Sequence, residues 1–254
     1  MNMKLHNPTL RVIEVIETVA ENQSGLSLSQ ISSKINCPKS TLMPILKTLC
    51  EKNYLLFSEE TLLYTMGKEI LFISSMYEST NTSLDLIQEQ MKRLSTECNE
   101  TCHLGILTGN EIMYLLKIST TNPIQLISSV GKRLPAYATA LGKALLLDKS
   151  INELEELFSN PFKAFTAQTI KSPIDLYNDI HNNNNSFTYE NEEITNHACC
   201  IALPIREDGK IVAALSVSFL TFTTSSEKVL KIKKELLKSA SIIERIIKNK
   251  GFSY

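Results

Sequence analysis

A proline turn between two short helical segments is the feature of this 254-residue chain that most restricts its fold. Leu28 and Ile31 lie one helical turn apart after Ser27, whose hydroxyl can cap a helix. Cys37-Pro38 ends that pattern, and a second helix is expected from about Lys39 to Lys52. Helix, short turn and helix together predict a helix-turn-helix motif.

The flanking segments predict that this motif belongs to a winged helix. Apolar residues at helical spacing predict an earlier helix over about Leu10–Val19. Downstream, Tyr54–Phe57 and Leu62–Tyr64 are short enough to form a β-hairpin around Ser58–Thr61. Three helices and a hairpin within residues 1–68 make a winged helix-turn-helix domain.

The remainder of the chain predicts a linker helix and a larger domain. The linker helix is expected over residues 69–83, with a polar break at Glu78–Ser83, before an amphipathic helix from Leu84 to Cys98. Strands are expected over 102–107, 111–116, 124–130, 187–190, 200–206 and 211–219, and helices over 135–148, 151–158, 174–181 and 226–248. We therefore expect an α+β protein in which residues 84–254 form a mixed sheet flanked by helices, with a solvated loop at 182–185.

Composition and charge limit the possible partners. No apolar run is long enough to span a bilayer, and the start of the chain lacks the apolar core of a signal peptide. We expect a cytoplasmic protein with no membrane contact, whose six cysteines are free thiols. Residues 1–70 hold seven basic and seven acidic side chains. Because DNA-binding domains usually present a basic surface, this balance counts against DNA binding.

Four motifs occur in a fixed order along the chain. They are Pro38-Lys39-Ser40-Thr41, Tyr64-x-x-Gly67-Lys68, the stretch from Gly131 to Leu146, and Cys200–Ile205 followed by Gly209 and Ala213–Ser218. In these motifs the chain resembles the IclR-type transcriptional regulators over nearly its whole length. The resemblance implies a winged helix-turn-helix, a linker helix and a GAF-like effector-binding domain, in homodimers or tetramers on double-stranded DNA.

The chain departs from that family pattern in the second helix of the motif. The family commonly has Thr-x-x-Arg there, whereas this chain has Thr41-Leu42-Met43-Pro44. Proline is tolerated only in the first turn of a helix, so the helix is expected to begin near Ser40. The expected wing also carries Glu59-Glu60 where a DNA-binding protein would favour cations.

Four residues at this helix are the candidate DNA contacts: Lys39, Ser40, Thr41 and Lys47. Hydroxyl groups and helix-start amides suit phosphate oxygens, and the N-terminal residues of a recognition helix reach base edges. The alternative is that Ser40 only caps the helix and that the lysines are solvated.

The candidate effector site combines a helix start with three strands. Gly131, Ala138, Thr139, Ala140 and Leu141 would offer free amides and little side-chain bulk, which suits a carboxylate. Further contacts would come from Glu190, Cys200, Ser216 and Ser218, where alternation places the two serines on one face. The ligand expected is a small organic acid. The alternative is that the small residues only allow close packing and that the serines are solvated.

Neither a metal site nor an active site is expected. Cys98, Cys102 and His103, or His197, Cys199 and Cys200, could together supply zinc ligands. However, neighbouring residues of a strand point to opposite faces, so these side chains cannot all converge. The sequence also lacks the nucleophile, phosphate-loop, zinc-protease and dinucleotide motifs. We expect no catalytic residue, no metal and no cofactor.

Two functional hypotheses follow. The first is a ligand-responsive transcriptional regulator that binds a palindromic operator as a dimer. The second is a metabolite-binding module whose DNA-binding head is degenerate and which acts through protein partners. The helix-turn-helix favours the first hypothesis, whereas the charge balance, Pro44 and the acidic wing favour the second.

Overall fold

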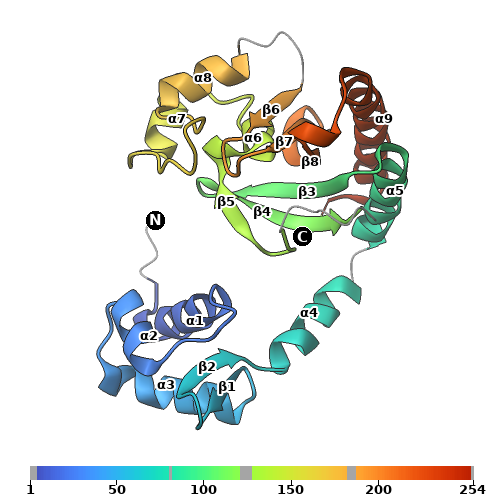
Figure 1. Cartoon of the computed structure of the whole chain (residues 1–254). Coiled ribbons are helices and arrows are strands. Elements are labelled where there is room, and N and C mark those ends of the chain that lie inside the picture. The colour runs from blue at the N-terminus through green and yellow to red at the C-terminus, as the bar shows by residue number, and fades with distance from the viewer. Residues whose placement is uncertain (1–4, 80–81, 121–127, 182–186, 253–254) are drawn as a thin grey trace. The chain divides into compact units, whose positions relative to one another are not determined.

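The computed structural model describes residues 5–79, 82–120, 128–181 and 187–252. The chain divides into two compact units, residues 1–80 and residues 81–254 (Figure 1). Each unit has a buried apolar core of its own.

The N-terminal unit is a winged helix. Its elements are α1 (Asn7–Ala20), α2 (Leu28–Lys34), α3 (Lys39–Glu51), β1 (Leu55–Ser58) and β2 (Leu63–Met66). The two strands form an antiparallel hairpin in which Leu55 pairs with Met66. Ser27 caps α2 through a reciprocal capping box with Gln30, as its sequence position predicts. Apolar side chains from all three helices and the hairpin fill the core, among them Val15, Ile31, Leu42, Leu46 and Leu55.

Helix α4 (Glu69–Ser79) follows the wing and leaves its apolar side chains open to solvent in the single chain. Leu71 is 74% exposed, Phe72 59%, Ile73 49% and Met76 51%. Residues 80 and 81 of the expected polar break lie outside the described residues.

The C-terminal unit is built on a six-stranded sheet in the described residues. Its strands are β3 (Thr101–Thr108), β4 (Glu111–Ile118), β5 (Arg133–Pro135), β6 (Thr188–Asn191), β7 (Ala198–Glu207) and β8 (Lys210–Leu220), in the order β5-β4-β3-β8-β7-β6. Every pairing between these strands is antiparallel. The expectation of a mixed sheet is therefore wrong. Hairpins at Gly109 and Gly209 supply two of the connections, and both glycines have positive φ.

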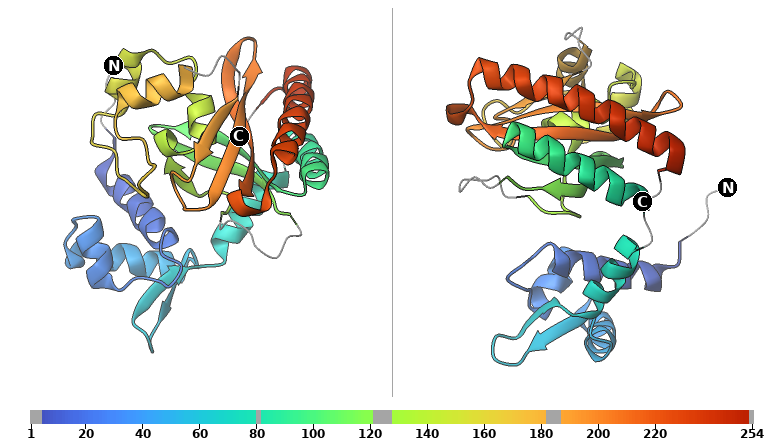
Figure 2. Two further views of the ribbon diagram at one scale, coloured as in Figure 1. Left: turned by 45° about the horizontal axis from the view of Figure 1, so that its top comes forward. Right: turned by 90° about the vertical axis from the view of Figure 1, so that its right-hand side faces the viewer.

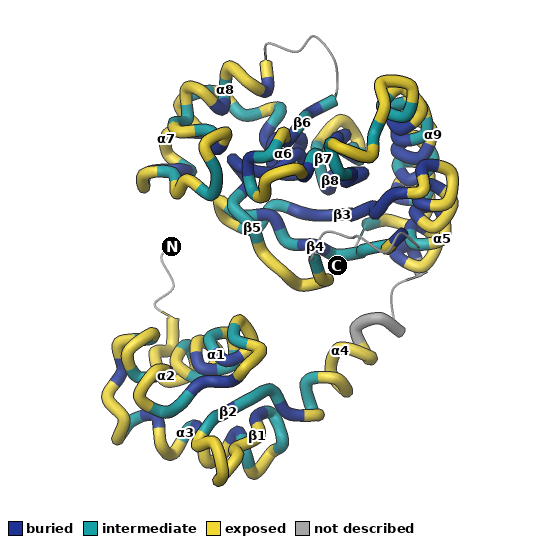
Figure 3. The backbone as a smooth tube through the Cα atoms, in the orientation of Figure 1, coloured by how far each residue is buried: buried dark blue, intermediate teal, exposed yellow. Residues whose placement is uncertain are grey.

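Each face of this sheet has its own helical cover. Figure 2 shows α5 (Thr82–Cys98) and α9 (Ser226–Lys250) side by side on one face, where they enclose a large apolar core. The other face is covered by η1 (Ala136–Ala138), α6 (Ala140–Leu145), α7 (Ile151–Leu157) and α8 (Pro173–His181). The two central strands, β3 and β8, are mostly buried between these layers (Figure 3). We call the face beneath α6 the α6 face.

Two sequence expectations change in the middle of the chain. The single helix expected over 135–148 is instead η1 and α6, because Thr139 is extended with φ of −125° and caps α6 through Gly142 N–H. Of the strand expected over 124–130, residues 124–127 lie outside the described residues, and residues 128–130 form no strand. The loop expected at 182–185 also lies outside them.

Pro44 lies inside α3 and not in its first turn. The helix begins at Lys39, as the helical pattern predicts and one residue before the start inferred from Pro44, so Pro44 is its sixth residue. Because proline has no amide hydrogen, the Ser40 carbonyl lacks the helical donor that residue 44 would otherwise supply. The Thr48 hydroxyl donates a hydrogen bond of 2.8 Å to the Pro44 carbonyl.

We predict that Pro44→Ala stabilises the N-terminal unit. The variant restores a helical N–H and removes the ring clash, while the unfolded chain gains some freedom, so the net gain should be about 1–2 kcal/mol. Urea unfolding followed by circular dichroism measures it. Pro38→Ala is the matched control, because Pro38 is the N-cap and removes no helical bond. An unchanged or lower stability of Pro44→Ala would contradict the prediction.

Candidate functional site

The candidate DNA contacts lie on the side of α3 that faces away from the core. Lys39, Ser40 and Lys47 are exposed and Thr41 is half-buried, whereas Leu42 and Leu46 on the opposite side are fully buried. Neither lysine forms an ion pair with another described residue. Both cations are therefore available to phosphate groups.

Ser40 does not cap this helix. The N-cap is Pro38, whose carbonyl accepts hydrogen bonds from the amides of Thr41 and Leu42 at 3.0 and 3.1 Å. The interpretation that Ser40 serves only as a cap is therefore wrong, and its hydroxyl is exposed on the second residue of α3. The expected acidic pair Glu59-Glu60 is exposed in the turn between β1 and β2.

Three of the candidate effector residues line up across adjacent strands of the α6 face. Ser218 on β8 is directly opposite Cys200 on β7, which is directly opposite Glu190 on β6. Thr101 on β3 completes this row on the other side of Ser218. Strand alternation places all four side chains on the same face, so the register creates a continuous polar row.

The next row along the strands contains the remaining serine. Ser216 on β8 is opposite His103 on β3 and Ala202 on β7, and Ala202 is opposite Thr188 on β6. The two rows make a patch in which Ser216 and Ser218 are only 2% and 5% exposed. The interpretation of these serines as a solvated face is therefore wrong in the folded chain.

Hydrogen bonds connect the two rows. Cys200 Sγ and Ser218 Oγ are 3.1 Å apart, and Ser218 Oγ lies 3.5 Å from His103 Nδ1. The other ring nitrogen of His103 is hydrogen-bonded to Ser128 Oγ at 2.8 Å, and its ring packs on Tyr114 with centroids 4.7 Å apart. The result is a chain of polar groups that crosses the face from β7 toward β4.

The hydrogen-bonded groups of this face are mostly uncharged at neutral pH. Burial, with a smaller effect of the Lys117 ammonium, lowers the pKa of His103 to about 3, so the imidazole is neutral. Burial raises the pKa of the Cys200 thiol well above its ordinary value and also raises that of the Tyr114 phenol. Burial raises the pKa of Glu190 as well, against the stabilising effect of amide hydrogen bonds. Its Oε1 accepts from the amides of Glu193 and Ile194 at 2.7 and 3.2 Å.

The predicted helix-start residues pack onto the same face, with one exception. Ala138, Thr139, Ala140 and Leu141 are buried, and the Thr188 hydroxyl donates to the Ala140 carbonyl at 2.7 Å. This bond ties the start of α6 to the row that contains Ser216. Gly131 instead lies in an exposed turn with φ of +81°, and its amide donates to the Tyr114 carbonyl at 2.8 Å. Eight of the nine candidate effector residues therefore lie on the α6 face, and Gly131 lies in a turn beside β4.

Gly142 has a packing role in this arrangement. A Cβ at this position would lie 2.1 Å from the Ala136 carbonyl oxygen, so only glycine allows α6 to approach η1 so closely.

His103, Tyr114 and Thr188 belong to the site although the sequence does not identify them as effector residues. The sequence marks His103 only as a possible zinc ligand. Alternation along β3 places Thr101 and His103 on one face, but only the pairing of β3 with β8 shows that this face carries Ser216 and Ser218. The same alternation directs Cys102 into the apolar core beneath α5 and α9. In the described residues no group of three His, Cys, Asp or Glu side chains is placed to hold a metal ion.

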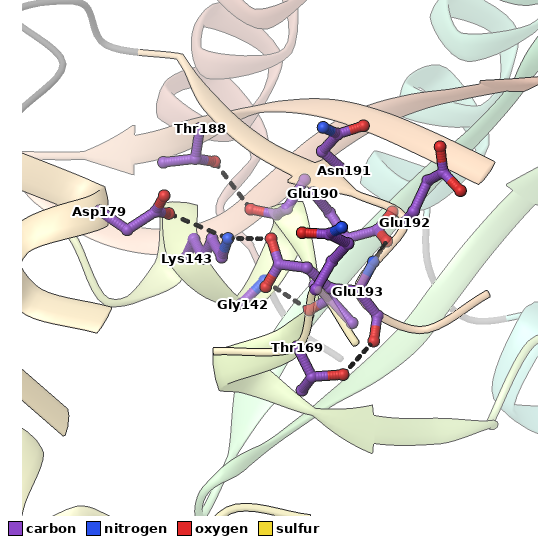
Figure 4. A network of polar contacts seen from close by, with 12 residues as sticks. Gly142, Lys143, Thr169, Asp179, Thr188, Glu190, Asn191, Glu192 and Glu193 are labelled. Atoms are coloured by element: carbon purple, nitrogen blue, oxygen red, sulfur yellow. Dashed lines mark hydrogen bonds and ion pairs between the residues drawn. The ribbon is translucent and has the colours of Figure 1, made fainter. Parts of the chain in front are cut away.

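A buried ion pair fixes the loop that follows Glu190 (Figure 4). Lys143 on α6 is 1% exposed, and its Nζ lies 2.5 Å from Glu193 Oε1 and 2.9 Å from Asp179 Oδ2 on α8. The Thr169 hydroxyl donates to the Glu193 carbonyl at 2.7 Å. Glu193 in turn donates its amide to Glu190, so the ion pair helps to hold the carboxylate of the polar row in place.

The chain thus combines a winged helix-turn-helix with a second domain that carries a buried polar face. The family description "Bacterial transcriptional regulator IclR C-terminal" matches residues 80–245, and "IclR helix-turn-helix domain" matches residues 9–57. The chain belongs to the IclR family of bacterial transcriptional regulators.

Individual relatives agree with this assignment. The chain is 29% identical over 224 residues to the HTH-type transcriptional regulator KdgR of Dickeya chrysanthemi, covering 86% of this chain and 72% of that protein. It is 27% identical over 243 residues to the HTH-type transcriptional regulator XynR of Escherichia coli, covering 93% and 95%. The chain is therefore a DNA-binding transcriptional regulator and not an enzyme.

Solved structures share the fold. The IclR regulator of Thermotoga maritima is 25% identical, with a TM-score of 0.70 over 97% of this chain and 100% of that one. An IclR homologue from Microbacterium hydrocarbonoxydans, crystallised with 4-hydroxybenzoate, is 23% identical, with a TM-score of 0.75 over 95% and 99%.

None of the described helices is both long and apolar enough to cross a bilayer.

We predict that Lys143→Met destabilises the C-terminal unit by about 3–5 kcal/mol, because it leaves Glu193 as an uncompensated buried carboxylate. Adding Glu193→Gln should recover part of that loss. Lys149→Met is the matched control, since its pair with Glu153 is exposed, is screened by solvent and should contribute far less to stability. Urea unfolding of all three variants gives the comparison. Equal losses for Lys143→Met and Lys149→Met would contradict the assigned role of the buried pair.

Proposed function

We propose that this regulator binds a palindromic operator as a homodimer, or as two dimers paired into a tetramer, and acts in the cytoplasm. The exposed apolar side chains of α4 support association, because Leu71, Phe72 and Met76 would be shielded from water by a second copy of the chain. A two-fold symmetric dimer places two equivalent recognition helices on two half-sites, and so matches a palindrome.

We propose that Lys39, Ser40, Thr41 and Lys47 make the contacts of α3 with DNA. Lys39 and Ser40 stand at the start of the helix, where amides and a hydroxyl suit phosphate oxygens. Lys47 lies two turns further along the exposed side and carries an unpaired charge among the described residues. Thr41 is half-buried at the first turn, where its hydroxyl would reach a base edge or a phosphate.

We propose that a small organic acid bearing a hydroxyl or keto group binds at the α6 face and modulates DNA binding. The observation that carries this proposal is the aligned row of Ser218, Cys200 and Glu190 beneath the start of α6. The amides of Ala140 and Leu141 precede the first internal hydrogen bond of α6, from Lys143 N–H to the Thr139 carbonyl. With the serine hydroxyls, they would supply neutral donors to a carboxylate.

Glu190 favours a ligand that has a hydroxyl group as well as a carboxylate. One of its oxygens accepts two amide hydrogen bonds, and the carboxylate, which also interacts with the Cys200 thiol, has remaining acceptor capacity for a ligand hydroxyl. A plain fatty acid would bring its apolar tail to this polar row and offer the row no hydrogen bond. The 4-hydroxybenzoate bound by a protein of the same fold combines the two groups, which makes hydroxybenzoates suitable first probes.

A second candidate function is favoured by the charges of the N-terminal unit. Its net charge over residues 1–70 is zero, and the wing turn exposes Glu59 and Glu60. A degenerate DNA-binding head that acts through protein partners would have these properties. DNA binding by the purified chain separates the two candidates.

We predict weakly salt-dependent binding to DNA from around the gene of this protein, because few cations face the duplex. Lys47→Ala should weaken binding to all sequences and reduce the slope of log K against log salt by about 1, because one phosphate is no longer neutralised. Thr41→Ala should instead lower the ratio of specific to non-specific affinity. Fluorescence anisotropy at several salt concentrations measures these effects, with Lys171→Ala as a control on an exposed lysine of the other unit. Absence of any specific binding at the lowest salt concentration would favour the degenerate head.

We predict that a thermal-shift screen of hydroxy and keto acids, with 4-hydroxybenzoate included, finds a stabilising ligand. Ser218→Ala should then weaken its binding by about 1.5 kcal/mol, or roughly tenfold in Kd, because the ligand carboxylate would have one hydrogen-bond donor fewer. Ser239→Ala is the control, because Ser239 is a buried serine on the opposite side of the sheet that accepts from Gln90 at 3.0 Å. It should leave the Kd unchanged. Equal effects of the two substitutions in calorimetry would place the ligand elsewhere.

A further inference from the structure

The centre of the exposed side of α3 is apolar. Ser40, Met43, Pro44 and Lys47 follow one another at intervals of three, one and three residues, which places them in one stripe along a helix. All four are exposed, and Met43 is 52% exposed. The stripe lies opposite the buried Leu42 and Leu46. Its middle consists of the Met43 thioether side chain and the Pro44 ring.

The wing extends this apolar surface into a groove of about 600 Å³. One wall is the stripe of α3, and the other is formed by Phe57 and Tyr64 of the hairpin. The rings of Phe57 and Tyr64 are 4.7 Å apart, and Phe57 is 42% exposed. Ser40 and Lys47 also line the groove, and their polar groups suit phosphate oxygens.

The occupant of this surface follows from its place in the fold. In a helix-turn-helix protein the exposed side of the second helix of the motif enters the major groove, and this chain is a DNA-binding regulator. Met43 and Pro44 carry no side-chain hydrogen-bond donor, and Pro44 also lacks a backbone N–H, so they cannot pair with the acceptor edges of guanine or adenine. The apolar group that a base pair presents in the major groove is the C5-methyl group of thymine.

We propose that Met43 and Pro44 recognise thymine C5-methyl groups in the operator half-site. This inference rests on the proposed operator binding and specifies its chemistry. Lys47 and Ser40 position α3 on the phosphates, and the methyl contacts select the sequence. Glu51, which also lines the groove, and Glu59-Glu60 in the wing turn reduce the sequence-independent electrostatic attraction to DNA, so apolar contacts contribute a larger share of the affinity than in a basic winged helix.

The test uses the full chain and a duplex selected by that chain from a random-sequence pool. Deoxyuridine then replaces thymidine at each position of the selected half-site, which removes one methyl group and leaves base pairing unchanged. We expect one or two positions at which this replacement weakens binding about fourfold, the effect of burying one methyl-sized group. Fluorescence anisotropy at one fixed salt concentration measures each duplex.

Variants assign the effect to the stripe. Met43→Ala combined with Pro44→Ala should bind the thymidine and deoxyuridine duplexes equally, and Met43→Gln, which keeps the length of the side chain, should reduce the preference. Lys47→Ala is the matched control from the same stripe, and it should weaken binding while preserving the ratio of about fourfold. Circular dichroism checks that each variant is folded, which we expect because Met43, Pro44 and Lys47 are all exposed.

The possible failures are distinguishable. A selected duplex that binds specifically but tolerates deoxyuridine at every position overturns the methyl recognition and leaves operator binding intact. A preference for thymidine that persists in the Met43→Ala, Pro44→Ala double variant also overturns it, because the methyl groups then contact other residues. If no sequence is enriched, operator binding fails together with this inference, and the groove would be the docking surface of a protein partner.

Discussion

The antiparallel pairing of β3 with β8 determines which side chains share each face of the sheet in the C-terminal unit. It joins residues more than one hundred positions apart and sets Thr101 against Ser218 and His103 against Ser216. Because side chains alternate, the same pairing directs Cys102, Leu215 and Val217 into the apolar core beneath α5 and α9. A shift of one residue would exchange the two faces, so a single register secures both the dry core and the polar rows.

Local sequence patterns predict most of the elements but not their long-range partners. Periodicity identifies the strands of the hairpins, and Ser27 identifies the start of α2, because both signals are contained within a few residues. His103 cannot be assigned to the α6 face from the sequence, because the residue opposite it, Ser216, comes from the distant strand β8. The break at Thr139 is equally hidden, since it depends on the close approach of Gly142 to the Ala136 backbone. Such contacts are tertiary, and no local propensity records them.

The polar rows of the α6 face contain mainly neutral hydrogen-bonding groups. His103 is neutral because burial lowers its pKa, and Cys200 and Tyr114 keep their protons because burial raises theirs. Lys143 carries the buried positive charge near α6, but Glu193 and Asp179 already bind it. A carboxylate that enters this face would therefore meet oriented neutral donors, whose direction can distinguish acids of equal charge but different shape.

The N-terminal unit likewise has little net charge with which to attract a ligand. Its zero net charge and acidic wing turn deprive it of much of the non-specific attraction that a basic winged helix has for any duplex. Placing Pro44 inside α3 costs helical stability, yet it puts a rigid apolar ring at the centre of the exposed stripe. Weak electrostatic attraction lowers the affinity for random DNA. Directional or apolar contacts maintain the affinity for a matched site. The scarcity of cations on this surface is therefore compatible with a selective regulator, because selectivity depends on the difference between those two affinities.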